Sequence, residues 1–247
     1  MFAMFQIEHF HEQRGTMEAG NRQKEILEIL HTKGRVSVGE LSRTLFVSEM
    51  TVRRDLAEME RCGFLYRYRG GAVPRYSSGE MPISERLLLD KEEKEALAAR
   101  CAEYISDGMV VFIDSSSTCQ FIIPYVAAKK DTKIITNSVK ALLTASELHI
   151  PSMLIGGEYY EQDMCLVGSL AEESAKNFNV DTAFFTTAAY SEEDGVISDF
   201  DLGQTSLRRV IMKNAKRNIF LFEKKKCHKK LLHTLCRADE AYAIITE

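Results

Sequence analysis

The chain has 247 residues, a formal net charge of −4 and 45% hydrophobic residues, which suits a folded protein and argues against disorder. No apolar run approaches the ~20 residues of a transmembrane helix, and no signal peptide is evident, so we expect no membrane association. Six cysteines without a C-x-x-C pair indicate reduced thiols and a cytoplasmic location. Cys227, His228, His233 and Cys236 match no zinc spacing, so we expect no metal or other cofactor.

The first part of the chain predicts two helices that precede a tight turn. The helix Asn21–Lys33 is apolar on one side. Ser37 and Glu40 form the capping-box pattern that begins a second helix, Val38–Leu45. The three residues that follow, Phe46-Val47-Ser48, are short enough for a turn into a third helix.

The third predicted helix, which Ser48 caps, carries two adjacent arginines on the side opposite its apolar stripe. The stripe consists of Val52, Leu56 and Met59, and the opposite side consists of Met50, Arg53, Arg54 and Ala57. Guanidinium groups suit phosphate oxygens and the O6/N7 edge of guanine, and a helix fits the major groove of DNA. A solvated charged face explains an isolated helix of this kind equally well. The preceding helix and turn favour the helix-turn-helix arrangement instead.

A β-hairpin is predicted directly after this helix. Phe64–Arg69 alternates apolar or aromatic residues with basic ones, Gly70-Gly71 turns the chain, and Ala72-Val73 returns. Such a hairpin is the wing of a winged helix, and it carries Arg67 and Arg69. The residues that we expect to contact double-stranded operator DNA are Ser48, Met50, Thr51, Arg53, Arg54, Arg67 and Arg69.

Charge is distributed unevenly along the chain. Residues 20–76 hold 11 Lys or Arg against 7 Asp or Glu, whereas residues 77–247 hold 20 against 26. A basic head on an acidic body is expected of a DNA-reading domain joined to a separate domain. We therefore predict an N-terminal extension (1–19), a winged helix-turn-helix domain (20–76) and a separate larger domain (77–247), for which a family resemblance given below implies effector sensing. We also expect Met17, rather than Met1, to be the working translation start.

The basic region resembles the winged helix-turn-helix of the DeoR family of bacterial transcription regulators. The resemblance rests on Val47-Ser48 in the turn, on the run Thr51–Leu56 and on Gly70-Gly71-Ala72. Arg69 departs from the family, in which His is common at this position. Because a carboxylate that faces phosphates is unfavourable, we expect Asp55 to pair with a nearby arginine rather than to contact DNA.

The second domain alternates strands and helices, which predicts an α/β fold with a mostly parallel sheet. A charged amphipathic helix over residues 90–106 comes first. The predicted strands are continuous apolar runs, typical of buried parallel strands: Met109–Ile113, Lys133–Thr136, Met153–Ile155, Ala183–Phe185, Asn218–Phe222 and Ala241–Ile245. The other predicted helices are Cys119–Ala128, Val139–Leu148, Leu170–Phe178, Leu202–Lys213 and Lys229–Leu235.

Small and polar residues follow nearly every predicted strand. Open parallel sheets bind their ligands at the carboxyl ends of strands. Hydroxyls, backbone N–H groups at helix starts and a lysine together suit a phosphate. Each element alone has an ordinary explanation as a cap, a turn or a solvated edge, but their common position favours a ligand site. The effector-binding residues that we expect are Asp114, Ser115, Ser116, Ser117, Thr118, Asn137, Ser138, Gly156, Gly157 and Lys226.

The second domain is similar to the effector domain of the DeoR family, whose fold is related to ribose-5-phosphate isomerase. The matching positions are Pro82, Glu85, Arg86, Glu93, Lys94, Asp114–Thr118, Thr136–Ser138, Gly156, Gly157, Leu166–Gly168, Val180, Asp181 and Lys226. The resemblance implies a sugar phosphate or related phosphorylated metabolite as effector. It also implies a homodimer or homotetramer, and repression of a carbohydrate-metabolism operon that the effector relieves.

Two departures from the family keep other functions open. The loop after the fourth strand commonly reads Gly-Ala-Asp-Gly but here is Thr186–Ala189, and the last loop opens with Glu223 instead of Asp. A sugar-phosphate isomerase with an added DNA-binding head would need a general base, which the fourth loop does not supply. A constitutive regulator with a decayed ligand site is the other alternative. We expect a regulator that is not an enzyme.

Overall fold

A computed structural model describes residues 17–75 and 81–246. The chain divides into two compact units, Met1–Met81 and Pro82–Glu247, which we call the N-terminal and C-terminal units. Residues 1–16 of the predicted extension, and with them the question of the translation start, lie outside the described residues.

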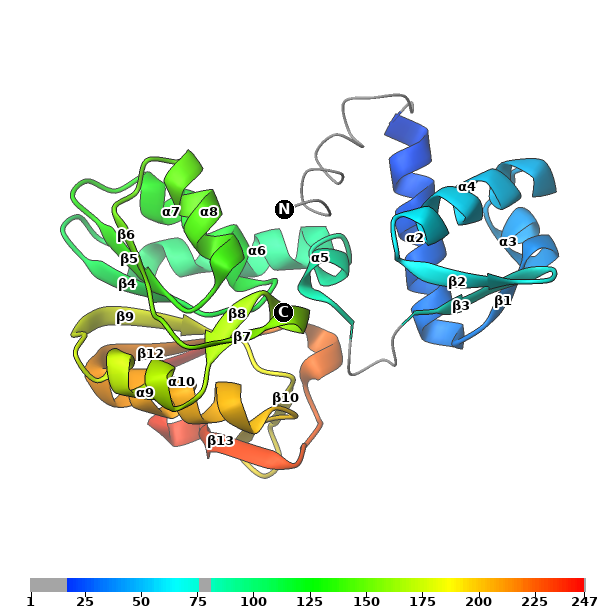
Figure 1. The fold of residues 1–247 in the computed structure, drawn as a ribbon. Coiled ribbons are helices and arrows are strands. Elements are labelled where there is room, and N and C mark those ends of the chain that lie inside the picture. The colour runs from blue at the N-terminus through cyan, green and yellow to red at the C-terminus, as the bar shows by residue number, and fades with distance from the viewer. Residues whose placement is uncertain (1–16, 76–80, 247) are drawn as a thin grey trace. The chain divides into compact units, whose positions relative to one another are not determined.

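The described residues of the N-terminal unit form the helices α2, α3 and α4 and a small antiparallel sheet (Figure 1). Its elements are α2 (Met17–Lys33), β1 (Val36–Ser37), α3 (Val38–Thr44), α4 (Glu49–Arg61), β2 (Leu65–Tyr68) and β3 (Gly71–Pro74). The strand order is β1-β3-β2. The predicted helix-turn-helix and wing are confirmed. The first helix begins at Met17, so the predicted start at Asn21 is wrong. Gly20 and Asn21 are poor helix formers, yet the helix includes both.

Side-chain caps begin both helices of the helix-turn-helix. Ser37 Oγ accepts a hydrogen bond from the Glu40 N–H at 3.1 Å, and Ser48 Oγ accepts one from the Thr51 N–H at 3.1 Å. Hydrogen bonds from Lys33 and from the Ser37 backbone lower the pKa of Glu40. The sequence pattern therefore identified both helix starts, because each cap satisfies a backbone donor that the first turn leaves free.

Phe46 occupies the turn between α3 and α4 in a conformation that large side chains rarely adopt. Its φ is +53°, and the side chain is 94% exposed, so burial does not compensate for the backbone strain. Left-handed backbone costs a non-glycine residue about 1–2 kcal/mol, and Asn tolerates it better. We predict that Phe46→Asn raises the free energy of unfolding by about 1 kcal/mol, measured by urea denaturation. Phe46→Leu is the control and should bring no gain. A less stable Phe46→Asn variant would contradict the prediction.

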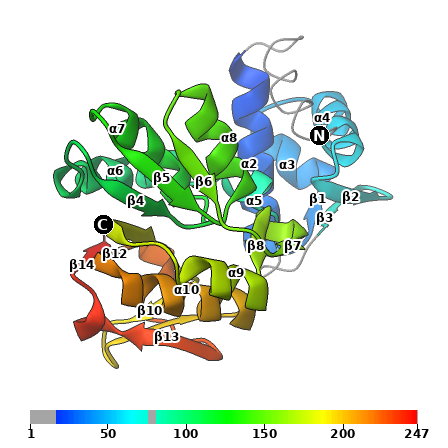
Figure 2. The same ribbon diagram turned by 60° about the vertical axis from the view of Figure 1, so that its left-hand side comes forward.

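The C-terminal unit is built on a six-stranded sheet with the order β14-β12-β9-β4-β5-β6 (Figures 1 and 2). The strands are β4 (Val110–Ile113), β5 (Lys133–Thr136), β6 (Ser152–Leu154), β9 (Val180–Phe185), β12 (Ala215–Phe222) and β14 (Ala243–Thr246). All neighbouring pairs are parallel, so all six predicted strands are confirmed. The chain runs outward from β4 to β6 and then from β9 to β14, which places the topological switch point between β4 and β9.

Helices cover both faces of this sheet (Figure 2). They are α5 (Ile83–Arg86), α6 (Lys91–Cys101), α7 (Ile123–Ala127), α8 (Val139–Glu147), α9 (Ser169–Ala175) and α10 (Leu202–Asn214), with the 3-10 helices η1 (Ala102–Tyr104), η2 (Cys119–Ile122), η3 (Glu161–Asp163), η4 (Lys224–Lys226) and η5 (Ala238–Glu240). Val111 and Ile113 point toward α6, α7 and α8, whereas Phe112 points toward α9 and α10. No helix in the described parts of the chain is both long and apolar enough to cross a membrane.

Short antiparallel strands flank the main sheet. They are β7 (Glu158–Tyr160), β8 (Cys165–Val167), β10 (Ala189–Ser191), β11 (Val196–Asp199) and β13 (His233–Arg237). The predicted helix Lys229–Leu235 is wrong, because its second half belongs to β13, which pairs with β11. This pairing buries Leu235 and Cys236 against the second helix layer. Tertiary packing therefore overrides the local helical pattern.

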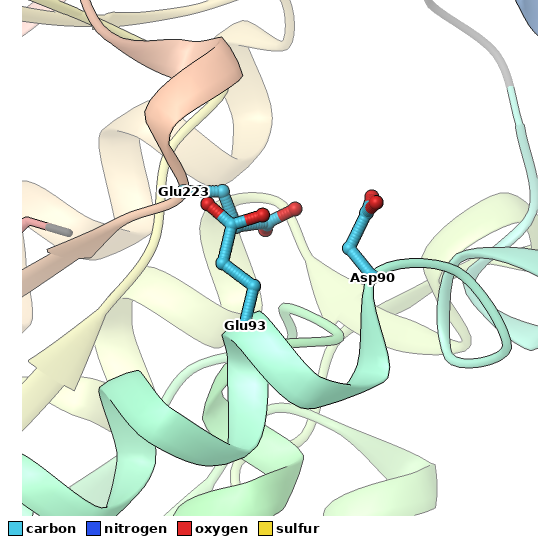
Figure 3. A group of neighbouring side chains, drawn as sticks. All are labelled: Asp90, Glu93 and Glu223. Carbon is cyan, nitrogen blue, oxygen red and sulfur yellow. The ribbon is translucent and has the colours of Figure 1, made fainter.

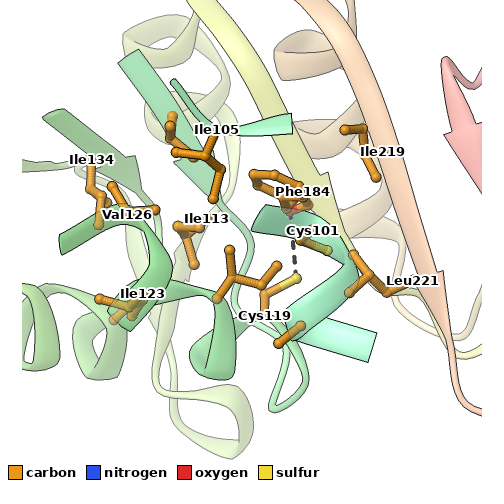
Figure 4. Packing of buried hydrophobic residues seen from close by; sticks show 14 of the residues in the cluster. Cys101, Ile105, Ile113, Cys119, Ile123, Val126, Ile134, Phe184, Ile219 and Leu221 are labelled. Carbon is orange, nitrogen blue, oxygen red and sulfur yellow. Dashed lines mark hydrogen bonds between the residues drawn. The ribbon is translucent and has the colours of Figure 1, made fainter. Parts of the chain in front are cut away.

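Cysteines are distributed unequally between the two units. All six are free thiols; Cys62 of the N-terminal unit is partly exposed, and the five in the C-terminal unit are buried. Figure 4 shows Cys119 in the hydrophobic cluster that also contains residues of α6, α7 and α8. Its Sγ lies 3.5 Å from the carbonyl oxygen of Phe184. Burial raises the pKa of Cys119, Cys165 and Cys236 to about 12, which keeps these thiols protonated.

Candidate functional site

The helix α4 presents its two arginines away from the core. Its stripe of Val52, Leu56 and Met59 is at most 1% exposed, while Arg53 and Arg54 are exposed. Arg53 pairs with Glu49 at 3.0 Å on the surface, whereas Arg54 has no partner among residues 17–75 and 81–246. Met50 is 76% exposed near the start of the helix. Ser48 is also exposed and Thr51 is half-buried, and their hydroxyl oxygens lie 2.9 Å apart.

Asp55 is the buried acid of α4. Its carboxylate accepts hydrogen bonds from Arg22 Nε at 2.6 Å and from Arg22 Nη2 at 3.1 Å. The prediction that Asp55 pairs with a nearby arginine is confirmed. The ion pair joins α4 to α2, so it fixes the orientation of the exposed arginines relative to the rest of the N-terminal unit.

A hollow of about 400 Å³ lies between α4 and the wing, and Arg53, Arg67 and Arg69 line it. Glu60 fixes the wing, because its carboxylate accepts from the Arg67 N–H at 2.8 Å and from Arg67 Nε at 2.7 Å. Arg69 has no partner within the described residues. The arginines suit a phosphate group, which they contact through charge-assisted hydrogen bonds.

In the C-terminal unit, the residues after β4 lie at the switch point of the sheet. We call them the 114–118 loop, and each of its five side chains is at most 6% exposed. The Ser115 hydroxyl donates to Gln204 Oε1 at 3.1 Å, and the Thr118 hydroxyl donates to Glu223 Oε1 at 2.8 Å. Ser116 Oγ accepts from the Cys119 N–H at 3.1 Å. A ligand must therefore exchange some of these internal bonds for its own.

Three backbone donors of the same loop have no acceptor among residues 17–75 and 81–246. Within the described chain, no acceptor is present for the N–H groups of Ser116, Ser117 and Thr118. Three N–H groups in succession form the kind of concave donor surface that binds anions.

Asp114 is held by a buried arginine. Arg208, which is 4% exposed, donates from Nη2 to Asp114 Oδ2 at 3.0 Å and from Nη1 to Asp199 Oδ2 at 2.7 Å. Burial acts to lower the pKa of Arg208, but the two carboxylates outweigh it and raise the pKa above its ordinary value. The structure thus places Asp114 against Arg208, where its carboxylate oxygens are already engaged.

Asn137 and Ser138 follow β5. Gln120, which lies two residues after the 114–118 loop, donates a hydrogen bond to Ser138 and so connects this segment to the loop. Ser138 Oγ accepts from the Ala141 N–H at 3.1 Å, which caps α8, and from Gln120 Nε2 at 3.3 Å. Asn137 Nδ2 donates to the Leu166 carbonyl at 3.2 Å. The Oδ1 atom of Asn137 is buried and has no hydrogen-bond partner in the described structure.

Gly157 packs against β8 and α9, and neither Gly156 nor Gly157 has a polar contact with the loop among the described residues. A Cβ at position 157 would lie 2.6 Å from the Val167 carbonyl oxygen and 2.8 Å from the Ala171 Cβ. Such distances exclude any side chain without backbone movement. The glycine at 157 is therefore explained by close packing, whatever its role toward a ligand.

Lys226 reaches the loop through a shared carboxylate. Its Nζ lies 3.0 Å from Glu223 Oε1, the same oxygen that accepts from Thr118. Lys225 Nζ lies 3.1 Å from Glu223 Oε2. Burial acts to raise the pKa of Glu223, but Lys226, Lys94 and Lys225 together hold it far below its ordinary value. The lysine and the loop hydroxyls are thus brought together.

Three carboxylates, including that of Glu223, lie close to one another beside Lys226 (Figure 3). Asp90, Glu93 and Glu223 are the one group of possible metal ligands that the described residues bring within 4.8 Å of one another. Glu93 accepts from the Lys224 N–H at 2.7 Å, and Lys225 pairs with Asp90. Because lysines and an N–H group already engage these acids, the cluster does not favour a divalent cation.

Lys94 is buried close to Glu223, and the sequence pattern could have identified it as an unusual lysine. It is 2% exposed, and its Nζ donates to the backbone carbonyls of Arg86 and Leu89. Burial lowers its pKa to about 8, against the opposing influence of Glu223. The signal was its spacing with Leu97, Ala98 and Cys101, which places a lysine on the buried stripe of α6.

Known proteins resemble the chain along most of its length. An HTH-type transcriptional regulator of Bacillus subtilis (strain 168), YulB, is 28% identical over 236 residues, which cover 94% of this chain and 90% of that protein. The glycerol-3-phosphate regulon repressor of Escherichia coli (strain K12) is 29% identical over 203 residues, or 81% and 79% of the two chains. Ribose 5-phosphate isomerase A of Methanocaldococcus jannaschii aligns in structure with 57% of this chain and 56% of its own, at 19% identity and a TM-score of 0.44.

Family-level matches cover both units. The DeoR-like helix-turn-helix domain matches residues 22–77, and the DeoR C terminal sensor domain matches residues 89–247. These two matches leave only the N-terminal residues and a short connecting segment unassigned. The chain therefore belongs to the DeoR family of helix-turn-helix transcriptional regulators.

Proposed function

We propose that the protein is a sequence-specific repressor that binds a DNA operator and releases it when a phosphorylated metabolite binds the C-terminal unit. The exposed Arg53 and Arg54, opposite a fully buried stripe on α4, are the observation that carries this proposal. A related protein is named as a glycerol-3-phosphate regulon repressor, which supports a carbohydrate or polyol phosphate as effector class. We expect the protein to act in the cytoplasm as a homodimer or homotetramer.

The 114–118 loop is the proposed phosphate site. The three unpaired N–H groups supply donors, and the Ser115 and Thr118 hydroxyls supply more once they leave their internal acceptors. Lys226, with the buried Lys94 behind Glu223, supplies positive charge. Asn137 Oδ1 accepts from a hydroxyl group, which suits the sugar or polyol part of the ligand.

An isomerase is the less favoured alternative because proton abstraction needs an available base. Arg208 engages Asp114 and Asp199, and lysines engage Glu223. The loop after β9 supplies Thr186 and Thr187 in place of acids. These contacts leave the proposed site suited to binding an anion rather than to removing a proton.

The decisive experiment begins with selection of an operator from random double-stranded DNA by the full chain. Operator affinity is then measured with a panel of phosphorylated sugars and polyols and with their unphosphorylated forms. We expect one phosphorylated compound to weaken operator binding at least about tenfold, and its unphosphorylated form to have no effect. Failure to select any operator would refute the DNA-binding proposal. An operator that no compound releases would identify a constitutive regulator.

We predict that Lys226→Ala retains operator affinity but needs about tenfold more of the active compound for release, because one charged contact to phosphate is lost. The measurement is a release titration followed by fluorescence anisotropy. Lys229→Ala, which removes an exposed lysine outside the loop, is the matched control and should behave as wild type. Equal release curves for Lys226→Ala and wild type would exclude a role for Lys226.

A further inference from the structure

Gln204 connects the 114–118 loop to the first helix of the C-terminal unit. Gln204 Oε1 accepts from the Ser115 hydroxyl at 3.1 Å, and its Nε2 donates to Asp163 Oδ2 at 2.5 Å. The other oxygen of Asp163 accepts from Arg86 Nη2. Arg86 ends α5, the first helix after the boundary between the two units at Met81. The connection is thus an unbroken chain of side-chain hydrogen bonds.

The surroundings of Gln204 determine its orientation. Its Oε1 faces two donors, the Ser115 hydroxyl and Arg208 Nη2, the latter at 3.0 Å, while its Nε2 faces the acceptor Asp163. Reversing the amide would lose these bonds and set its NH₂ group against Arg208. Gln204 is 5% exposed, so solvent would not replace the lost partners. The orientation of the Gln204 amide is therefore fixed, with its oxygen toward Ser115 and its nitrogen toward Asp163.

The proton on Ser115 cannot serve two acceptors at full strength. A serine hydroxyl has one donor hydrogen, and the oxygens of an ionised phosphate are acceptors. A phosphate bound in the 114–118 loop that takes this hydrogen removes it from Gln204 Oε1. The Gln204 amide is then held at Oε1 by Arg208 alone, which changes its donation to Asp163 and, through Asp163, the hold on Arg86.

We propose that Gln204 is a positioning residue that reports occupancy of the 114–118 loop to α5 through Asp163 and Arg86. The inference rests on the proposed phosphate-binding function of that loop and adds the route by which it acts. It assigns a regulatory role to a buried glutamine outside the residues proposed to bind DNA and phosphate. In sequence, Pro82, the N-cap residue of α5, directly follows the boundary between the two units at Met81.

A ligand-free test uses hydrogen exchange of the full chain. The amides of Leu87 and Leu88 report on α5, because they donate to the carbonyls of Ile83 and Glu85 at 2.9 and 3.0 Å. Ser115→Ala removes the first link, and we expect it to speed exchange at these amides about threefold. In a Gln204→Met background, Ser115→Ala should have no further effect at Leu87 and Leu88.

Ser198→Ala is the matched control. Ser198 is also fully buried, and its Oγ accepts from the Leu231 N–H at 2.9 Å, outside the chain of bonds to α5. We expect it to leave exchange at Leu87 and Leu88 unchanged. Equal effects of Ser115→Ala and Ser198→Ala would overturn the proposal, as would an effect of Ser115→Ala that survives in Gln204→Met. Asp163→Asn, at a side chain that is 13% exposed, replaces Gln204→Met where the latter fails to fold.

A second test uses glycerol 3-phosphate as the probe. In wild type, binding of the probe should change exchange at Leu87 and Leu88. Gln204→Met should bind it within about threefold of wild type by calorimetry but show no such change. An unaltered exchange response in Gln204→Met would overturn the proposal. If no phosphorylated compound binds wild type, the effector part of the proposed function fails, and the ligand-free test still decides whether Gln204 couples Ser115 to α5.

Discussion

Replacing Arg53 and Arg54 together by alanine is expected to lower operator affinity about a hundredfold or more, since each bidentate base contact contributes about 1–3 kcal/mol. Both side chains are exposed and opposite the buried stripe of α4, so the thermal midpoint of unfolding should change by less than about 2 °C. Fluorescence anisotropy with the selected operator measures the affinity, and a salt titration separates base contacts from phosphate contacts.

Arg61→Ala is the control for charge on the same helix. Arg61 lies at the end of α4 and pairs with Glu58 on the surface. Its loss removes one positive charge without changing the proposed recognition face, so we expect less than about a threefold change in affinity. Unchanged affinity of the Arg53 and Arg54 double variant would refute the assignment of α4 as the recognition helix.

Arg208→Met is expected to destabilise the C-terminal unit by about 3–5 kcal/mol, because it leaves buried carboxylates without their cation. Asp114 and Asp199 are 1% and 8% exposed, so water does not solvate them in place of the guanidinium. The methionine fills much of the vacated volume, which limits the contribution of a cavity. Urea denaturation of the full chain measures the loss.

A compensating change distinguishes this electrostatic effect from altered packing. Adding Asp114→Asn to Arg208→Met should restore part of the lost stability, since it removes one uncompensated buried charge. Lys216→Met, which breaks the exposed pair with Asp181, should cost less than about 1 kcal/mol. If Arg208→Met is no more destabilising than Lys216→Met, the buried ion pairs of Arg208 with Asp114 and Asp199 make no special contribution to stability.

The sequence predicted the parallel sheet well because each of its strands is a continuous apolar run. The strand Asn218–Phe222, for example, lies wholly within β12, where Phe220 and Phe222 are fully buried. The strands β7 and β10 carry no comparable signal, since their sequences Glu158–Tyr160 and Ala189–Ser191 include polar residues and each strand depends on an antiparallel partner. The helix predicted at Lys229–Leu235 failed for the same reason: its conformation depends on pairing with β11.

The candidate sites divide in a similar way. Arg53 and Arg54 were predictable because an exposed face follows from helical periodicity alone. Gln204 and Arg208 were not identified, because polar residues on a predicted amphipathic helix are ordinarily solvated. Both lie on the buried side of α10 with Leu207 and Ile211, and they bond Asp163 and Asp114, which lie 41 and 94 positions away in sequence. Sequence spacing within one helix cannot indicate such distant pairs.

The unequal burial of the cysteines makes the two units separately observable by thiol labelling. Cys62 is the one cysteine of the N-terminal unit and is partly exposed, so a maleimide reagent should modify it without unfolding of the C-terminal unit. Cys119 and Cys165 can react only when the sheet and its helices separate, since burial keeps them protonated and shielded. The labelling rates of Cys119 and Cys165 therefore record the opening of the C-terminal unit, and a ligand that stabilises this unit should slow their reaction but not the reaction of Cys62.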